Sequence, residues 1–564
     1  MEIVGKEKIS EYIKEHKEPV TVAVILIMCF LLYFFALDNY PVLDPYESKF
    51  VSIARSMFNS GDSVVLSLNG NFFFETPPLY FWIESFFFNI LGKISEGIAR
   101  IPVALCATFG VFLVYAICRK VVARKNAIVA SSILATSFMY IILAKIAVTD
   151  MMFCLFTGVS VYAGICTLLY SESYKKYFWW IFYIFAAFCL MTKGFIGILV
   201  PFITVFLCCL LTGKIKEMFK PVFLFPGLMF FVIIVFPWHW IMFSQYNPMF
   251  FNEYILKQHV DKYWYLFANG EPAPWYYIFL AFIGAFMPWF LSFVAQILVF
   301  IKEKITQIAK YFTELESLNF PQKFLFYNVI YFAVVICVFS FLATKHPVYV
   351  LPALVPASVI LSKFWVDYFE EDKHGIAVNI TMGLWTVLTI AGIAGVFFMP
   401  DFFKGQVKQE LMHIQPEILL LLLVVLTMQI FAYIRKAKKV LFSSLIVMMT
   451  GFSMLMSVGG FNAICAKGQY DIVLYSIIAE KEGVPLATYN LQNNYSVLYY
   501  YGKDLITFSE KQFPDLLSLS ESYPESRIIL PNNTLKELSE EYDFITVGEG
   551  LKYSMIKNVK PKED

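Results

Sequence analysis

About thirteen apolar runs of membrane-spanning length constrain what this chain can fold into more than any other feature. They cover approximately residues 20–37, 101–119, 126–144, 151–170, 177–192, 194–212, 220–242, 276–302, 325–343, 347–365, 375–398, 416–434 and 440–460. A helix of about 20 apolar residues crosses a hydrocarbon layer roughly 30 Å thick. Hydrophobic residues make up 59% of the chain and its mean hydropathy is +0.65, so most of it must use lipid as solvent. The sequence therefore predicts a polytopic α-helical membrane protein with about 13 transmembrane helices.

The apolar run Leu79–Leu91 is an exception, because it is too short to cross. Its length of about 13 residues corresponds to roughly 20 Å of helix. We expect this helix to lie along the membrane surface. Basic clusters within 119–125, 175–176, 214–220, 302–310 and 435–439 then all fall on the side of the N-terminus. By the positive-inside rule that side is the cytoplasm, which places the C-terminus outside.

The tail after the last apolar run predicts a separate soluble domain. Its apolar stretches at 528–531 and 544–547 alternate with helix-like stretches at 515–522 and 534–541. This alternation is typical of an α/β domain. We assign 1–460 to a transmembrane domain, with exterior loops at about 38–100 and 243–275, and 461–564 to a small exterior α/β domain.

Charge and cysteine usage exclude several classes of protein. The net charge is +1, and the chain has no basic tail and no nucleic-acid motif, so nucleic acid is not expected as a partner. The chain also contains no P-loop and no G-x-G-x-x-G, which argues against a cytoplasmic nucleotide site. Most of the ten cysteines lie inside apolar runs, where they behave as small hydrophobic residues.

Three carboxylates stand out in the first exterior loop. Asp44 and Glu47 follow the first span in L-D-P-Y-E-S-K-F and precede an amphipathic stretch over Ser48–Asn59. This turn aims two carboxylates at the lipid boundary, where one serves as a general base or both serve as charges at a helix start. Glu75 precedes T-P-P, so its backbone is held extended. That geometry suits a ligand or a positioned acid, and equally an ordinary carboxylate before a helix.

Further polar residues are predicted on the same exterior side. Asp150 begins a span in A-V-T-D-M-M, either as part of a site or as a helix cap. Lys193 in M-T-K-G-F and Lys345 in A-T-K-H-P-V-Y either bind anionic groups or reach to the interface. His259 lies in the long loop, and a lone histidine is more often not a metal ligand.

Together these residues favour one chemistry over another. Lysines suit a phosphate, aromatic side chains suit a sugar or a lipid tail, and a carboxylate suits removal of a proton from an acceptor. A sugar donor carried on a lipid phosphate needs all three. A transporter is instead expected to place charges near the membrane midplane, on broken helices and in paired halves, a pattern that the sequence lacks.

In combination and order, several motifs resemble those of one enzyme family. They are E-S-K-F-V-S-I-A-R-S-M with G-D-S-V-V, N-G-N-F-F-F-E-T-P-P-L, T-D-M, M-T-K-G-F, Q-H-V-D-K-Y-W, P-W-Y-Y followed by M-P-W, and K-H-P-V-Y-V-L-P. From Leu43 to about Pro352 the chain resembles the GT-C glycosyltransferases that use polyprenyl-phosphate sugars. The resemblance is greatest to the lipid A aminoarabinose transferases, which are akin to protein O-mannosyltransferases.

The resemblance implies a GT-C fold in a bacterial inner membrane and an inverting transfer of a sugar on the exterior face. The expected donor is a polyprenyl-phosphate sugar, and the expected acceptor is a lipid A-like glycolipid, another envelope glycan or a protein. A first-loop carboxylate is expected to activate the acceptor. The expected catalytic residues are Asp44, then Glu47, with Asp150.

The resemblance also implies binding residues for the donor and for a metal. The donor phosphate and its lipid are expected to contact Lys193, Lys262, Lys345 and Tyr349. A divalent metal such as zinc is expected between Glu75 and His259.

Two positions depart from the pattern of the family. Tyr46 stands where relatives carry the aspartate of D-E, so Asp44 or Glu47 must supply the carboxylate. Thr76 stands where relatives carry the lysine of E-K-P, which removes a phosphate contact. The alternatives to a transferase are a transporter of a lipid-linked sugar or envelope precursor and an inactive homologue that binds lipid.

Overall fold

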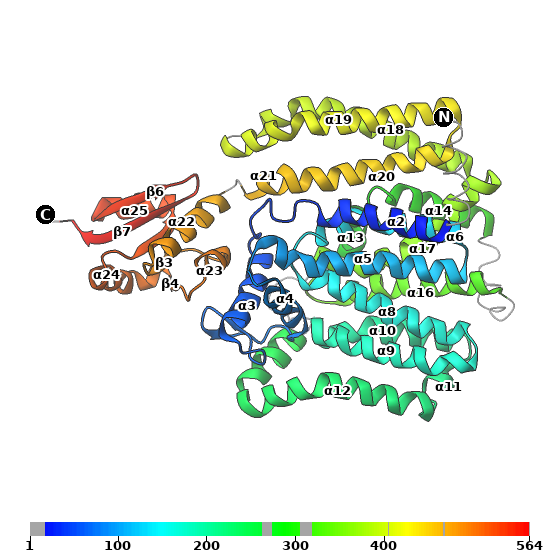
Figure 1. The fold of residues 1–564 in the computed structure, drawn as a ribbon, viewed down its shortest axis with the longest axis horizontal. Coiled ribbons are helices and arrows are strands. Elements are labelled where there is room, and N and C mark those ends of the chain that lie inside the picture. The colour runs from blue at the N-terminus through cyan, green and yellow to red at the C-terminus, as the bar shows by residue number, and fades with distance from the viewer. Residues whose placement is uncertain (1–16, 262–272, 305–317, 404, 466–467, 563–564) are drawn as a thin grey trace, which may run out of the picture.

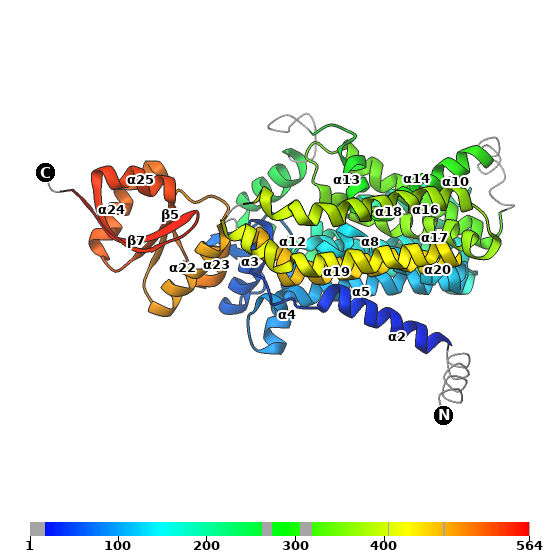
Figure 2. The ribbon, with the colours of Figure 1, turned by 90° about the horizontal axis from the view of Figure 1, so that it is seen from above.

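The computed structural model describes residues 17–261, 273–304, 318–403, 405–465 and 468–562. Figure 1 shows two parts, a bundle of roughly parallel helices and a smaller α/β domain at one end of that bundle. The view from above shows the same arrangement, with the α/β domain continuing the long axis of the bundle (Figure 2). The polar first loop lies at the end of the bundle that faces this domain (Figure 1).

The helices of the bundle follow the predicted apolar runs. They are α2 (Lys17–Cys29) with η1 (Phe30–Phe34), α5 (Glu96–Val121), α6 (Arg124–Ala135), α7 (Phe138–Leu143), α8 (Thr149–Leu169), α9 (Glu172–Lys193), α10 (Ile196–Leu211), α11 (Ile215–Met218), α12 (Pro221–Tyr246), α13 (Tyr277–Ala285), α14 (Phe290–Lys304), α16 (Phe320–Phe341), α17 (Leu351–Glu371), α18 (Gly375–Phe398), α19 (Gly405–Arg435) and α20 (Lys438–Leu455). The π-helices η2 (Phe251–Asp261) and η7 (Met456–Gly460) and the 3₁₀ helices η5 (Pro347–Val350) and η6 (Met399–Phe402) connect some of them, and α21 (Phe461–Cys465) follows η7.

Eight of these helices are long and apolar enough to cross a membrane, counted within the described ranges. The count becomes nine if α13 and α14, which meet at a bend of 115°, form one broken span. The runs predicted at 20–37, 126–144, 177–192 and 194–212 also form helices, but these do not meet the same criterion. A multi-pass helical membrane protein is therefore confirmed, and the number thirteen stays a prediction.

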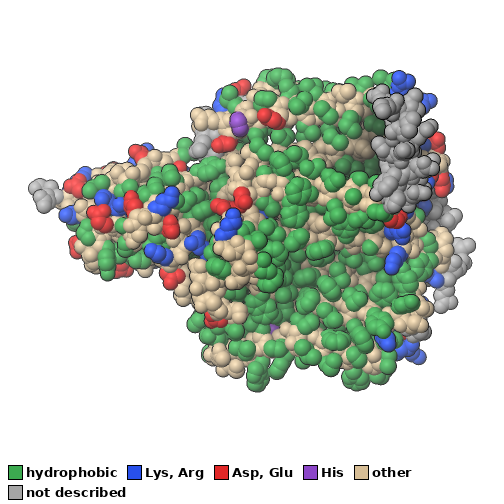
Figure 3. All heavy atoms as spheres, viewed as in Figure 1, with side chains coloured by type: hydrophobic (Ala, Val, Ile, Leu, Met, Phe, Trp, Pro, Cys, Tyr) green, Lys and Arg blue, Asp and Glu red, His purple; other side chains and the backbone are tan. Residues whose placement is uncertain are grey.

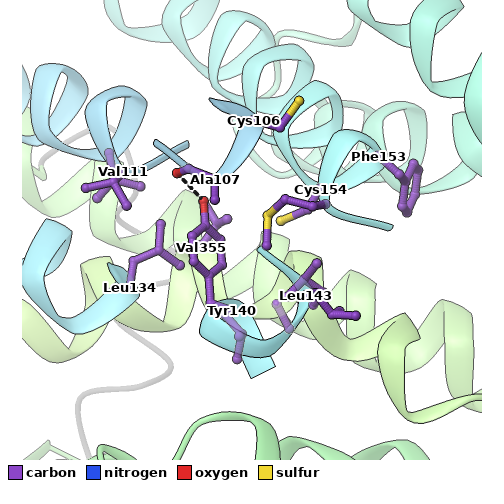
Figure 4. Close-up of a cluster of buried hydrophobic side chains, with 14 of the residues drawn as sticks. Cys106, Ala107, Val111, Leu134, Tyr140, Leu143, Phe153, Cys154 and Val355 are labelled. Carbon is purple, nitrogen blue, oxygen red and sulfur yellow. Dashed lines mark hydrogen bonds between the residues drawn. The ribbon is translucent and has the colours of Figure 1, made fainter. Parts of the chain in front are cut away.

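Close packing between α5, α7 and α8 forms the centre of the bundle. The Tyr140 hydroxyl, fully buried, donates a hydrogen bond of 2.9 Å to the Ala107 carbonyl (Figure 4). A Cβ atom at Gly110 would lie 2.2 Å from that hydroxyl oxygen, so only glycine allows the ring to approach this closely. Buried polar groups in lipid need such internal partners, because no water is available to them.

The first exterior loop folds into two helices and a small hairpin. These are α3 (Tyr46–Ser60), β1 (Ser67–Leu68), β2 (Asn71–Phe72) and α4 (Leu79–Leu91). Both helices stop at a glycine in the left-handed region, Gly61 at φ 70° and Gly92 at φ 66°, where other residues are strained. The helix α4 has the bounds predicted for the short apolar run, and it packs beside α3 and against α5.

The C-terminal part is the predicted α/β domain. Its elements are α22 (Gln469–Glu482), β3 (Leu486–Tyr489), α23 (Ser496–Tyr501), β4 (Ile506–Phe508), η8 (Glu510–Gln512), α24 (Phe513–Ser522), β5 (Arg527–Pro531), α25 (Asn532–Glu541), β6 (Tyr542–Glu549) and β7 (Tyr553–Pro561). The five strands form one sheet in the order β4-β3-β5-β7-β6. The first three strands are parallel, and β7 runs antiparallel to β5 and to β6.

The helical bundle and the α/β domain also differ in the composition of their surfaces. Hydrophobic side chains dominate the visible face of the bundle, whereas charged side chains of both signs cover the α/β domain (Figure 3). Lys and Arg side chains also gather at the end of the bundle away from that domain (Figure 3). This distribution suits a bundle in lipid with basic loops at one end, and the direction in which it faces stays a prediction.

Candidate functional site

Glu47 lies in a completely buried ion pair with Arg100 of α5. The distances from Arg100 Nε to Glu47 Oε1 and from Nη2 to Oε2 are 2.8 and 2.9 Å. The backbone amides of Leu43 and Ala147 also donate to this carboxylate, at 2.7 and 2.8 Å. A carboxylate offers about four acceptor positions, so Glu47 has none left for an incoming group.

Arg100 is saturated as well. Its guanidinium also donates to the carbonyls of Leu37 at 2.6 Å, Tyr40 at 2.9 Å and Pro41 at 2.8 Å. It stacks on the Tyr40 ring, 3.7 Å from the ring centroid. All five N–H groups of Arg100 are therefore used, and the cluster ties the end of the first span to α3 and α5.

Asp44 lies in a different environment, at the joint between the two domains. Its Oδ1 accepts hydrogen bonds from the Ser48 hydroxyl and, at 2.9 Å, from the Ser496 amide at the start of α23. Its Oδ2 accepts one from the Ser496 hydroxyl. Three of about four acceptor positions are filled, and the side chain keeps partial contact with solvent. Burial raises the pKa of the Asp44 carboxyl above its ordinary value, and the hydrogen bonds from Ser48 and Ser496 counteract part of that rise.

Asp150 and Lys193 form an ion pair, with 2.9 Å between Lys193 Nζ and Asp150 Oδ1. Asp150 lies in the first turn of α8 and Lys193 in the last turn of α9. Val148 is the N-cap residue of α8, so Asp150 is not the cap. The Thr149 hydroxyl beside it is buried without a hydrogen-bond partner in the described part of the chain. The pair thus joins two helix ends that face the first loop.

Lys193 is followed by a glycine that lets His259 approach. Gly194 has φ 70°, and a Cβ atom there would lie 2.1 Å from His259 Nε2. His259 Nε2 accepts a hydrogen bond from the Phe195 amide at 3.0 Å, and Nδ1 donates to the Tyr254 carbonyl at 2.5 Å. The motif M-T-K-G-F therefore contains both Lys193 and the glycine against which His259 packs.

Lys345 and Tyr349 lie in the segment before α17, Lys345 just ahead of η5 and Tyr349 within it. Lys345 is buried and its Nζ donates to the Ala273 carbonyl at 2.7 Å. His346 contacts the rings of both Tyr46 and Tyr349, with centroid distances of 6.2 and 5.5 Å. Tyr46, at the position of the family aspartate, and Tyr349, the predicted lipid-site tyrosine, therefore both lie next to His346.

Glu75 pairs with Lys49 of α3, with 2.7 Å between Nζ and Oε1. His259 presents Nδ1–H to a carbonyl, the tautomer that leaves Nε2 for a metal, yet that lone pair is directed at the Phe195 amide. Within the described residues no group of three potential metal ligands occurs. In this arrangement Glu75 is paired with Lys49 and His259 Nε2 with the Phe195 amide, so a metal between Glu75 and His259 stays a prediction and we derive no step through it.

Four of the predicted residues are connected through short contacts of their own side chains or of adjacent residues. Glu47 contacts Ala147 in the turn before Asp150, Asp150 pairs with Lys193, and His259 bonds the amide of Phe195. Lys262 lies outside the described residues.

Sequence reasoning missed Arg100, Lys49 and Ser496. Arg100 directly precedes the apolar run 101–119, and a charge at the end of such a run is a signal of a functional or buried pair. The pairing of Ser496 with Asp44 has no local signal, because 452 positions separate the two residues.

Known proteins share both this sequence pattern and this fold. Residues 75–241 match the family model of dolichyl-phosphate-mannose-protein mannosyltransferases. An undecaprenyl phosphate-alpha-4-amino-4-deoxy-L-arabinose arabinosyl transferase of Yersinia enterocolitica is 24% identical over 65% of this chain and 64% of its own length. A protein of Aquifex aeolicus is 28% identical over 66% of this chain and 68% of its own length. The match thus spans about two thirds of each relative.

The crystal structure of ArnT from Cupriavidus metallidurans bound to undecaprenyl phosphate superimposes with a TM-score of 0.76. The superposition covers 96% of this chain and 97% of that one, at 17% identity. The chain is therefore a multi-pass membrane protein with the GT-C fold and a small C-terminal sheet domain. Within that class it resembles the lipid A aminoarabinose transferases, which confirms the resemblance predicted from the sequence.

Proposed function

We propose that this protein is a membrane glycosyltransferase that moves a sugar from a polyprenyl-phosphate donor to an acceptor on the exterior face of the bacterial inner membrane. The proposal rests on one observation above all. Asp44 contacts Ser496 of the α/β domain, and its neighbours connect it to the other predicted residues: Glu47 accepts from the Ala147 amide, shortly before the Asp150–Lys193 pair, and Tyr46 lies next to His346 in the segment of Lys345 and Tyr349. The end of the bundle that faces the α/β domain is also where a lipid-borne phosphate and a water-borne or lipid-borne acceptor meet.

Comparison of the two first-loop carboxylates favours Asp44 as the general base. Glu47 is saturated by four donors, whereas Asp44 retains an acceptor position and some exposure. The raised pKa of Asp44 also makes it a stronger base than an ordinary aspartate. We assign Glu47 instead to positioning, since it fixes the turn that carries Asp44.

The transfer is a single displacement. The acceptor hydroxyl gives its proton to the Asp44 carboxylate while its oxygen attacks the anomeric carbon of the donor sugar. The bond from that carbon to the phosphate oxygen breaks, and the phosphate takes the electron pair and leaves as polyprenyl phosphate. Attack opposite to the leaving group inverts the anomeric configuration.

Lysine side chains stabilise the negative charge that develops on the phosphate. Lys193, held by Asp150, and Lys345, held by the Ala273 carbonyl, are the described candidates, and Lys262 stays a prediction. Tyr349 offers an aromatic face to the isoprenoid chain next to the phosphate. The relative whose structure contains undecaprenyl phosphate supports a polyprenyl carrier. The sheet domain then lies outside the membrane.

A transfer assay tests the proposal. The full chain is reconstituted in vesicles with a radiolabelled polyprenyl-phosphate sugar and an extract of envelope lipids and proteins as acceptor. A labelled product with a new glycosidic bond is expected. Movement of the labelled lipid across the bilayer without a new bond would identify a transporter instead, and carrier binding without turnover would identify an inactive homologue.

A further inference from the structure

A pocket of about 360 Å³ lies between the first loop and the C-terminal domain. One wall comes from the β1–β2 hairpin and the segment up to Glu75, and the other from β3, β4 and the start of α23. The proposed transfer mechanism uses none of the residues that line this pocket.

The two walls are fixed to each other. The Asn69 side chain makes two hydrogen bonds to Leu505, accepting from its amide at 2.6 Å and donating to its carbonyl at 2.9 Å. The Ser52 hydroxyl donates to the Tyr495 carbonyl at 3.3 Å, and Arg55 donates to the Tyr499 carbonyl. The pocket is therefore a built part of the joint between the domains.

The lining is rich in groups that both donate and accept hydrogen bonds. It contains four asparagine side chains, and two threonines, Thr488 and Thr507, are neighbours in the β3–β4 ladder. Paired strand residues project to the same face, so both hydroxyls point one way. Within the described residues the side chains of Asn493 and Thr507 make no hydrogen bond and are exposed at the pocket.

The charge of the lining excludes a phosphate as occupant. No Lys, Arg or His lines the pocket in the described part of the chain, and Glu75 is the one acid there. Lys49 pairs with Glu75 and leaves the rim close to neutral. Phe72 adds an exposed aromatic ring, while Lys49 Nζ lies over the rings of Phe73 and Tyr495. Amides, hydroxyls and an aromatic face without net charge match a ring with many hydroxyl groups.

The place of the pocket links it to the transfer site. Tyr495 lines the pocket, and the next residue, Ser496, bonds both oxygens of Asp44. We propose that this pocket binds the uncharged, hydroxyl-rich glycan of the acceptor and so delivers an acceptor hydroxyl to Asp44. The proposal rests on the proposed function and names where the substrate that receives the sugar binds.

Binding of arrayed oligosaccharides tests this directly. The full chain in lipid nanodiscs is applied to neutral probes, maltotetraose and chitotetraose, and to an acidic probe, tetragalacturonate. Neutral binding is expected to fall at least tenfold in Thr507→Trp, which fills the pocket from an edge strand, and severalfold in Asn493→Gly. Asn490→Gly is the matched control. Both asparagines have positive φ, 54° at Asn490 and 61° at Asn493, so glycine relieves the backbone equally, and Asn490 lies outside the pocket.

Three results would overturn the pocket assignment: no binding of the neutral probes, equal binding by Thr507→Trp and the wild type, or a preference for the acidic probe. Slow release of sugar from the donor to water, measured without acceptor, reports the transfer site separately. This release is expected to persist in Thr507→Trp. Absence from the wild type of both this release and transfer to the envelope extract would refute the proposed function, while glycan binding is read independently.

Discussion

Two regions of the first loop, three residues apart in sequence, use a carboxylate in opposite ways. Around Glu47 the chain surrounds the acid with four donors and excludes solvent completely. Around Asp44 the chain leaves the acid at an interface between two domains, with an acceptor position open. The first arrangement holds the fold, and the second is available for chemistry.

The difference lies in what each carboxylate faces. Glu47 points into the bundle toward Arg100, where an unpaired charge is costly, so every lone pair has a donor. Asp44 faces a serine of another domain, whose hydroxyl can rotate and whose contact can change if the domains move. A carboxylate that must be paired and a carboxylate that must react thus lie three residues apart at the start of α3.

Replacing each acid by its amide tests whether Asp44 and Glu47 have different roles. Asp44→Asn is expected to lower the transfer rate by about 10²–10⁴-fold, because a positioned base is lost. The amide keeps the shape of the side chain and one acceptor oxygen, so thermal unfolding should change little. Initial rates with the radiolabelled donor and the unfolding midpoint check both expectations. An unchanged rate would remove Asp44 from the mechanism.

Glu47→Gln is expected to act on the fold rather than on the chemical step. It leaves Arg100 buried with an uncompensated charge, which costs about 3–5 kcal/mol of stability. The yield of monodisperse protein and the midpoint of thermal unfolding measure this loss.

The double variant Glu47→Gln with Arg100→Gln provides the control. It should be less destabilised than the sum of the two single variants, since the partners interact. A stable Glu47→Gln protein that cannot transfer sugar would instead identify Glu47 as the base.

Much of the fold was predictable because it follows from local patterns. The length and bounds of α4 come directly from the apolar run Leu79–Leu91, and the alternation of the tail predicts its α/β domain. The number of spans was less predictable. The run at 126–144 is divided into α6 and α7, and the run at 276–302 bends by 115° between α13 and α14. Because hydropathy is averaged over a window of residues, it does not detect such breaks.

Some parts of the candidate site were likewise predictable from the sequence, and others were not. Sequence motifs placed Asp150 and Lys193 in it, and the two form an ion pair. The choice between Asp44 and Glu47 could not be made from the sequence, because it depends on Arg100 and Ser496, which are distant along the chain. A contact between residues far apart along the chain produces no local sequence pattern from which it could be predicted.

Lys193→Gln tests the donor side of the Asp44 region. Loss of one charge-assisted contact to phosphate is expected to raise KM for the polyprenyl-phosphate donor by about tenfold. Binding of polyprenyl phosphate to the protein in nanodiscs should weaken in parallel. Lys216→Gln is the control, because Lys216 is exposed on α11 at the far end of the bundle. Equal effects of the two changes would show that only net charge matters.

The smallest expected effect is a shift in pH dependence at the joint between the domains. The Asp44 carboxylate must be ionised to act as a base, so transfer falls as pH drops through its pKa. Hydrogen bonds from Ser496 stabilise the ionised form and keep that pKa lower than burial alone would set it. Ser496→Ala removes the hydroxyl donor and is expected to move the acidic limb of kcat/KM to higher pH, by less than about one unit.

Whether this shift in the acidic limb occurs shows which of the two carboxylates, Asp44 or Glu47, titrates. Ser496 contacts Asp44 through both its amide and its hydroxyl, whereas the four donors to Glu47 are Arg100, through two nitrogens, Leu43 and Ala147. Ser522→Ala, an exposed change in the same domain, should leave the profile unmoved. If Ser496→Ala also leaves the limb in place, the group that titrates is not Asp44, and the open carboxylate at the joint serves to hold the domains together.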